Sequence, residues 1–183
     1  MSNFDLERLS VLVVEDAPFM STLMYSALKA LGVGTIKSAT DGGDAIELFK
    51  VVKKTPSKAG IMTVDLVISN WQMSPIDGLM LLRWIRRHPD SLDRFMPFIM
   101  VTAHSDGRSV RAARDMGVTE FLTKPYSVSA LATKMVQVIE RPRQFVQTAD
   151  YFGPDRRRNK RPHKGEERRV LTDKSDGVEV VYG

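Results

Sequence analysis

Short apolar runs alternate with longer segments of helical periodicity along the first 140 residues of the chain. The runs have the length and the β-branched content of strands: Ser10–Val14, Thr35–Ala39, Val64–Ser69, Phe98–Thr102 and Val118–Leu122. Each run is followed by a segment in which apolar side chains recur every three or four residues. The pattern therefore predicts one strand–helix unit repeated five times.

Proline and glycine set the expected ends of the helices. The first helix is expected to begin near Pro18 and to end at Gly32. Its expected core-facing stripe consists of Phe19, Leu23, Leu28 and Leu31. The other four helices are expected at Ala45–Lys53, Leu79–Arg87, Asp106–Met116 and Ser127–Glu140. Strands that are joined through helices run parallel with right-handed crossovers. We therefore expect an α/β fold with a five-stranded parallel sheet and helices on both faces.

Composition narrows the functional classes. With 43% hydrophobic residues the chain can bury a core, and the absence of cysteine excludes a disulfide scaffold and a thiol nucleophile. Its apolar stretches are shorter than the ~18 residues of a membrane helix, and its N-terminal residues lack the apolar region of a secretory signal. A cytoplasmic protein with no membrane contact is therefore expected.

The net charge of +5 is distributed unevenly along the chain. Residues 1–140 hold 16 basic and 15 acidic residues, whereas residues 141–183 hold 11 basic and seven acidic ones. The segment Arg156–Arg169 alone has eight basic and two acidic residues. We expect residues 142–183 to form a basic, mostly disordered C-terminal extension in which Val178–Tyr182 is apolar enough to add an edge strand. The extension lacks a recognition helix, so nucleic-acid binding is not expected.

Polar side chains stand where the predicted strands end. They are Glu15 and Asp16 after the first strand, Asn70 at the third, Thr102 at the fourth and Lys124 after the fifth. The carboxyl ends of parallel strands meet at one edge of a sheet, where α/β proteins bind ligands. The acid pair suits a hard divalent cation such as Mg²⁺, and hydroxyl and ammonium groups suit the oxygens of a phosphoryl group.

Four segments, in this order on a fivefold strand–helix pattern, resemble the receiver domain of two-component response regulators. They are VLVVEDAPFM at residues 11–20, DLVISNWQMSPIDGL at residues 65–79, IMVTAH at residues 99–104 and EFLTKPYS at residues 120–127. The likeness implies a receiver domain at residues 9–141 with a flavodoxin-like (βα)₅ fold.

The resemblance also implies roles for the residues at this edge of the sheet. Receiver domains bind Mg²⁺ at an acid pair, which corresponds to Glu15 and Asp16, and at a backbone carbonyl, which corresponds to Gln72. Thr102 and Lys124 match the hydroxyl and the lysine that contact the phosphoryl group.

A conformational switch is implied as well. Thr102 and the aromatic Phe121 match the pair that changes rotamer together in the family, and the Lys124–Pro125 bond matches one that is usually cis. The switch alters the face built by the fourth helix, the fifth strand and the fifth helix.

Asn70 departs from the family at the phosphoacceptor position, where other receivers carry aspartate. Its amide nitrogen is not a nucleophile, and its carbonyl oxygen cannot form an acyl phosphate. The change also removes one negative charge from the cation site. We therefore expect weakened Mg²⁺ binding and no phosphorylation of this chain.

Two interpretations of Asn70 follow. The chain is either a substituted, silenced version of an ordinary receiver or a natural receiver that works without phosphorylation. In the second case it would act as a constitutive adaptor or a decoy binding module. The sequence favours the first interpretation slightly, because the other site residues, Glu15, Asp16, Thr102 and Lys124, are all present.

The expected function is that of a single-domain response regulator in phosphorelay signal transduction. It would act by protein–protein interaction rather than as an enzyme, since no Ser–His–Asp ordering, HExxH motif or P-loop spacing occurs. The expected partners are a cognate histidine kinase or phosphotransfer protein and a downstream protein target. The switching face is also a surface through which a homodimer could form.

Overall fold

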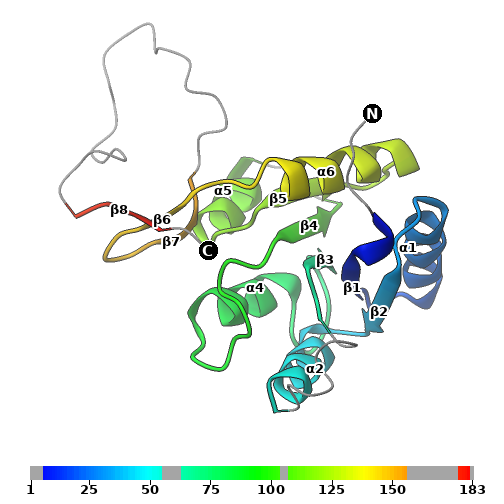
Figure 1. Cartoon of the computed structure of the whole chain (residues 1–183), viewed down its shortest axis with the longest axis horizontal. Coiled ribbons are helices and arrows are strands. Elements are labelled where there is room, and N and C mark those ends of the chain that lie inside the picture. Colours follow the sequence, from blue (N-terminus) through cyan, green and yellow to red (C-terminus); the bar gives the residue numbers. More distant parts are fainter. Residues whose placement is uncertain (1–5, 55–62, 104–106, 156–176, 182–183) are drawn as a thin grey trace, which may run out of the picture.

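One parallel sheet forms the centre of the computed structural model, which describes residues 6–54, 63–103, 107–155 and 177–181 (Figure 1). Its strands are β1 (Ser10–Val14), β2 (Thr35–Ala39), β3 (Leu66–Asn70), β4 (Phe98–Thr102) and β5 (Glu120–Thr123). Their order is β2-β1-β3-β4-β5, and every neighbouring pair is parallel. The expected (βα)₅ flavodoxin-like fold is confirmed.

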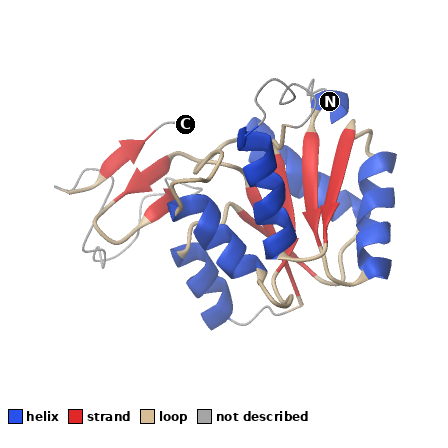
Figure 2. Ribbon diagram, turned by 90° about the horizontal axis from the view of Figure 1, so that it is seen from below, coloured by secondary structure: helices blue, strands red, loops and turns tan. Residues whose placement is uncertain are grey.

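Helices cover both faces of this sheet (Figure 2). They are α1 (Pro18–Ala30), α2 (Gly42–Lys54), α4 (Gly78–Arg87), α5 (Gly107–Asp115) and α6 (Val128–Glu140), and a 3₁₀ turn, η1 (Leu6–Arg8), precedes β1. Asp77 and Ser127 cap α4 and α6 by accepting hydrogen bonds from Met80 N and Ala130 N. Within the described residues, no helix is long and apolar enough to cross a membrane.

Alternation along β1 divides the core into two layers. Every residue of this strand is buried, and successive side chains point to opposite faces. Val11 and Val13 belong to the layer with α1 and α6, whose buried side chains are Met24, Leu28, Leu131, Met135 and Val138. Leu12 and Val14 belong to the layer with α2 and α4, whose buried side chains include Ala45, Phe49, Leu81, Leu82 and Ile85. Burial on both faces explains why β1 is apolar throughout.

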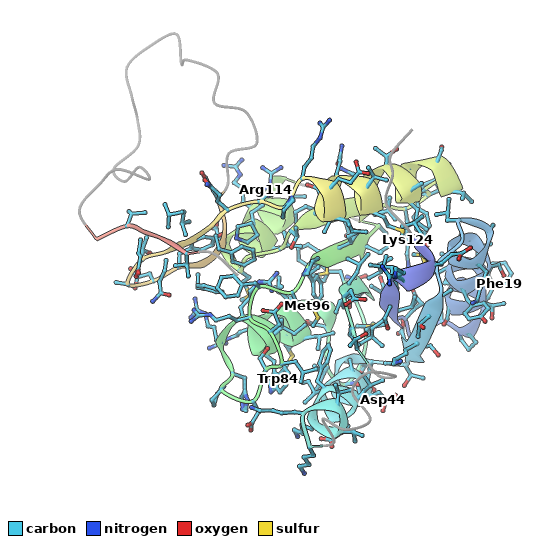
Figure 3. The ribbon with its side chains drawn as sticks, viewed as in Figure 1. Phe19, Asp44, Trp84, Met96, Arg114 and Lys124 are labelled. Carbon is cyan, nitrogen blue, oxygen red and sulfur yellow. The ribbon has the colours of Figure 1, made fainter. Side chains whose placement is uncertain are left out.

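The expected apolar stripe of α1 is wrong in its first half. Phe19 is 77% exposed and Leu23 is 49% exposed, whereas Met24 and Leu28 are buried against the sheet. Figure 3 shows Phe19 on the outer side of α1, away from the sheet. The helical repeat places residues 24 and 28 on one face, and residues 19 and 23 lie on another. Hydrophobicity alone did not distinguish these two faces.

The C-terminal extension contains a second, smaller sheet. Its strands β6 (Phe145–Gln147), β7 (Phe152–Pro154) and β8 (Glu179–Val181) are antiparallel in the order β7-β6-β8. Phe145 and Phe152 are each only 7% exposed. These strands are the ordered part of an extension that was expected to be mostly disordered, and the basic segment Arg156–Arg169 lies outside the described residues. The expected edge strand within Val178–Tyr182 corresponds to β8.

The two buried phenylalanines of the extension pack on the body of the protein. Phe95, in the segment before β4, lies 5.1 Å from the Phe145 ring centroid and 5.4 Å from that of Phe152, both in edge-to-face geometry. The guanidinium of Arg94 lies 3.4 Å from the Phe152 ring centroid. Aromatic pairs in this geometry stabilise the folded state by more than the burial of their area alone.

Removal of the extension should therefore destabilise the receiver. Truncation after Arg141 takes away Phe145 and Phe152, each of which contributes about 2 kcal/mol by burial. We expect the thermal unfolding midpoint, measured by circular dichroism, to fall by about 5–10 °C.

A truncation after Asp155 is the matched control, because it keeps β6 and β7 and removes the partly exposed β8. It should lower the midpoint by less than about 3 °C. An unchanged midpoint after truncation at Arg141 would contradict the packing described above.

Candidate functional site at the carboxyl edge of the sheet

The polar residues singled out in the sequence lie at one edge of the sheet. Glu15 and Asp16 directly follow β1, and Asn70 is the last residue of β3. These two strands are neighbours at the point where the chain switches direction across the sheet, which is where α/β folds form ligand sites. Thr102 ends β4 as a buried residue, and its carbonyl accepts a hydrogen bond of 2.7 Å from Lys124 N.

The Asn70 amide group lies between the expected metal ligands. Its Nδ2 donates to the Gln72 carbonyl at 2.9 Å and to Glu15 Oε1 at 3.1 Å. A longer contact of 3.4 Å joins it to Asp16 Oδ1. An amide nitrogen carries two hydrogens, so the two shorter bonds use both. The amide hydrogens, which carry partial positive charge, therefore point at oxygens that a cation would otherwise contact.

Lys124 completes the network from the opposite side. Its Nζ donates to Glu15 Oε2 at 3.0 Å and to Asn70 Oδ1 at 3.4 Å. These bonds fix the orientation of the asparagine, because a flipped amide would turn its oxygen toward the carboxylates and its NH₂ toward an ammonium group. Glu15 is only 8% exposed, and a buried carboxylate requires such partners. One lysine thus faces two acids in this cluster.

A glycine allows the chain to pass beneath the site. After Asn70 the backbone turns back, and Gly78 N donates to the Trp71 carbonyl at 2.9 Å. A Cβ atom on Gly78 would lie only 2.2 Å from the Asn70 carbonyl oxygen, so no larger residue fits without a backbone shift. Asp77 then starts α4 through its cap. The Asp77–Gly78 pair therefore positions α4 directly under the end of β3.

Two aromatic residues that sequence reasoning left without a role lie next to the site. Trp71 stacks on Phe121 with ring centroids 6.5 Å apart and an interplanar angle of 27°, so the expected switch residue has a defined neighbour. Tyr126 follows the Lys124–Pro125 bond, which is cis as expected. Burial, followed by the nearby Glu15 carboxylate, raises the pKa of the Tyr126 hydroxyl. The sequence signal that could have pointed to these two residues is their position directly after Asn70 and Pro125.

The oxygen atoms at this edge are of the kind that Mg²⁺ prefers, and the Asn70 amide contacts them. The Glu15, Asp16 and Gln72 oxygens that would hold the cation all accept hydrogen bonds or contacts from Asn70 Nδ2. In the described part of the chain, no group of three or more His, Cys, Asp or Glu side chains is arranged to hold a metal ion. A cation would therefore have to displace the amide.

An open cleft of about 440 Å³ gives solvent access to the acid pair. It lies between the start of α1 and the segment that joins β2 to α2. Its lining residues are Glu15, Asp16, Pro18, Ser21, Thr22, Ser38, Ala39, Thr40 and Asp44. The site is thus accessible to small solutes, although Glu15 itself is buried.

A doubly wound (βα)₅ sheet with an acid pair, a threonine and a lysine at its carboxyl edge defines a signalling receiver module. The family model of the response regulator receiver domain matches residues 11–136. The chain belongs to this family.

Relatives and solved structures agree with this assignment. Chemotaxis protein CheY-3 of Vibrio cholerae is 27% identical over 135 residues, or 74% of this chain and 95% of that protein. A probable chemotaxis protein CheY of Rhizobium etli is 30% identical over 125 residues, or 68% of this chain and 88% of that protein. The CheX–CheY–BeF₃–Mg²⁺ complex of Borrelia burgdorferi has a similar fold, with a TM-score of 0.58 and 23% identity over 71% of this chain and 88% of that one.

Asn70→Asp should make the stability of the protein depend on Mg²⁺. The variant loses the amide hydrogen bonds and places a third carboxylate beside Glu15 and Asp16, at a cost of about 1–3 kcal/mol. In EDTA we expect its thermal midpoint to lie several degrees below that of the unaltered chain. About 10 mM MgCl₂ should restore it, because a ligand that binds the folded state stabilises that state.

The unaltered chain should shift by less than about 1 °C with the same salt. Gln147→Glu is the control, since it makes the same change of charge on β6, outside this site. Equal Mg²⁺ responses in the unaltered chain and the Asn70→Asp variant would contradict the competition described above.

Proposed function

We propose that this chain is a single-domain response regulator that signals through protein–protein contacts without a phosphoryl group on residue 70. The observation that carries the proposal is the hydrogen bonding of the Asn70 amide to Glu15, Gln72 and Lys124. These hydrogen bonds support a site whose polar groups are hydrogen-bonded to one another. The asparagine leaves one negative charge fewer at this edge for a cation to balance.

The chemistry of the amide supports the same conclusion. Phosphorylation of an ordinary receiver requires a carboxylate oxygen to attack phosphorus and to keep the group as an acyl phosphate. The nitrogen lone pair of Asn70 is delocalised into its carbonyl, and the neutral amide oxygen is a poor nucleophile. Glu15 cannot replace it, because its two carboxylate oxygens are already paired with Asn70 Nδ2 and Lys124 Nζ.

Magnesium binding is proposed to be weaker than in ordinary receivers. Receiver domains bind Mg²⁺ at this edge, and the CheX–CheY complex of Borrelia burgdorferi contains it. Here Glu15, Asp16 and the Gln72 carbonyl would hold the ion, which would neutralise charge at the acid pair. The asparagine removes one negative charge and occupies these oxygens, and both effects lower the affinity.

The proposed output surface is the face formed by α5, β5 and α6. Thr102 and Phe121 would be its switch residues, and the Trp71 stack on Phe121 supports a defined position for that ring. A histidine kinase or phosphotransfer protein and a downstream protein are the proposed partners, and a homodimer through this face is a further proposal. Without phosphorylation, only a partner that prefers one state of this face can change its population.

The origin of Asn70 leaves two candidate functions. The complete set of Glu15, Asp16, Thr102 and Lys124 favours a silenced version of an ordinary receiver. The fit of the amide among these groups favours a natural adaptor or decoy that binds its partner constitutively. A cytoplasmic location stays a prediction for both.

Acetyl phosphate separates these possibilities. After incubation with Mg²⁺ and acetyl phosphate, intact-protein mass spectrometry should detect no added phosphoryl group on the unaltered chain. Asn70→Asp supplies the missing carboxylate, and in a silenced receiver it should gain one hydroxylamine-labile phosphoryl group. The same variant in EDTA is the control for dependence on the metal.

Each outcome of this experiment decides between the candidates. A hydroxylamine-labile adduct on the unaltered chain would overturn the proposal of phosphorylation-independent action. Inertness of Asn70→Asp under conditions that restore its Mg²⁺-dependent stability would favour the natural adaptor. Rapid labelling of that variant would favour the silenced receiver.

A further inference from the structure

The extension contacts the edge of the main sheet that lies opposite Asn70. Phe95 precedes β4, and Gly117 and Thr119 precede β5, so all three stand at the amino ends of their strands. Figure 1 shows β6 and β7 beside α5 and on the side of the molecule away from α1 and α2. The extension therefore contacts the segment between α5 and β5, two elements of the α5–β5–α6 face.

Backbone packs directly on backbone at this contact. Gly117 turns the chain from α5 into β5 with a φ of +88°, and Gly153 of β7 lies against it. A Cβ atom on Gly153 would lie 2.6 Å from Gly117 Cα, and one on Gly117 would lie 2.9 Å from the Phe152 carbonyl oxygen. The approach is possible only because both residues are glycine.

Arg86 of α4 joins the turn, the segment before β4 and the extension. This side chain is 2% exposed. Its Nε donates to the Gly117 carbonyl at 3.0 Å and its Nη1 to the Arg94 carbonyl at 2.9 Å. Its guanidinium lies 5.2 Å from the Phe145 ring centroid. Desolvation lowers the pKa of Arg86 to about 10, so the group stays charged at neutral pH and these contacts must offset its burial.

Thr119 receives hydrogen bonds from three elements. Its hydroxyl accepts from Arg86 Nη2 at 3.4 Å and from Phe98 N of β4 at 3.1 Å. Its carbonyl accepts from Arg143 Nη1 of the extension at 3.3 Å. Thr119 is 5% exposed and directly precedes β5, the strand that carries Phe121. The extension thus reaches within two residues of the proposed switch aromatic.

We infer that the extension braces the α5–β5 turn through the Gly117–Gly153 contact, the Arg143 hydrogen bond to Thr119 and the packing of Phe145 on Arg86, which itself donates to Gly117. The brace holds α5 and the start of β5 in one arrangement, and its release lets these elements open locally. This inference deepens the proposed function. It rests on that proposal only in taking the α5–β5–α6 face as the output surface. A partner that needs a different arrangement of this face must first work against the brace.

Hydrogen exchange measured by mass spectrometry on the full chain tests this inference. Gly153→Val adds a branched side chain that has no room against Gly117 or Tyr151, and it deletes no part of the extension. We expect exchange in peptides that cover α5 and β5 to rise about tenfold, with exchange in α1 and α2 unchanged. Phe152→Ala, which removes the apolar anchor instead, should have the same local effect.

Ala149→Val is the matched control, because Ala149 is exposed in the turn between β6 and β7. It should leave exchange in α5 and β5 as in the unaltered chain. Unchanged exchange in Gly153→Val and Phe152→Ala would overturn the brace, and so would a uniform rise over all helices, which indicates general destabilisation. No phosphoryl donor or partner is used, so this result is independent of the acetyl phosphate experiment.

Discussion

A buried carboxylate governs the chemistry of this receiver. Glu15 follows an apolar strand that is covered on both faces, and its side chain is therefore held where water reaches little of it. Such a group must be paired or neutralised. Lys124 supplies the charge and Asn70 supplies the second donor, and these two contacts connect the ends of three strands. The arrangement of the whole carboxyl edge follows from satisfying this one acid.

The asparagine changes the balance of that edge rather than its shape. With an aspartate at this position, three carboxylates would face one lysine, and the repulsion among them would favour an external cation. The amide instead presents its hydrogens to Glu15 and the Gln72 carbonyl and its oxygen to the lysine, so each of these three neighbours meets a complementary partner. The same backbone, turn and glycine therefore support a site in which Glu15, Asn70 and Lys124 are hydrogen-bonded to one another. This is a difference of one functional group at one strand end.

The sequence predicted the main sheet, and the meeting of these polar residues at its carboxyl edge, for a clear physical reason. Strand and helix periods are local signals, and parallel topology brings strand ends together without knowledge of any contact. The extension could not be predicted in this way, because Phe145 and Phe152 stand in polar surroundings and become buried only against Phe95 from a distant segment. The exposure of Phe19 was missed for a related reason, since a helix with apolar residues on two faces does not reveal which face meets the sheet.

The chain has only two tryptophans, one directly after β3 at the carboxyl edge of the sheet and the other within α4. Trp71 follows Asn70 and stacks on Phe121, whereas Trp84 lies two residues before Arg86 and stacks on Phe49 and His88. Replacement of either one by phenylalanine leaves a protein whose indole emission comes from a single known place. The molecule thus contains two native optical probes, one for the carboxyl edge and one for the helix that holds the extension.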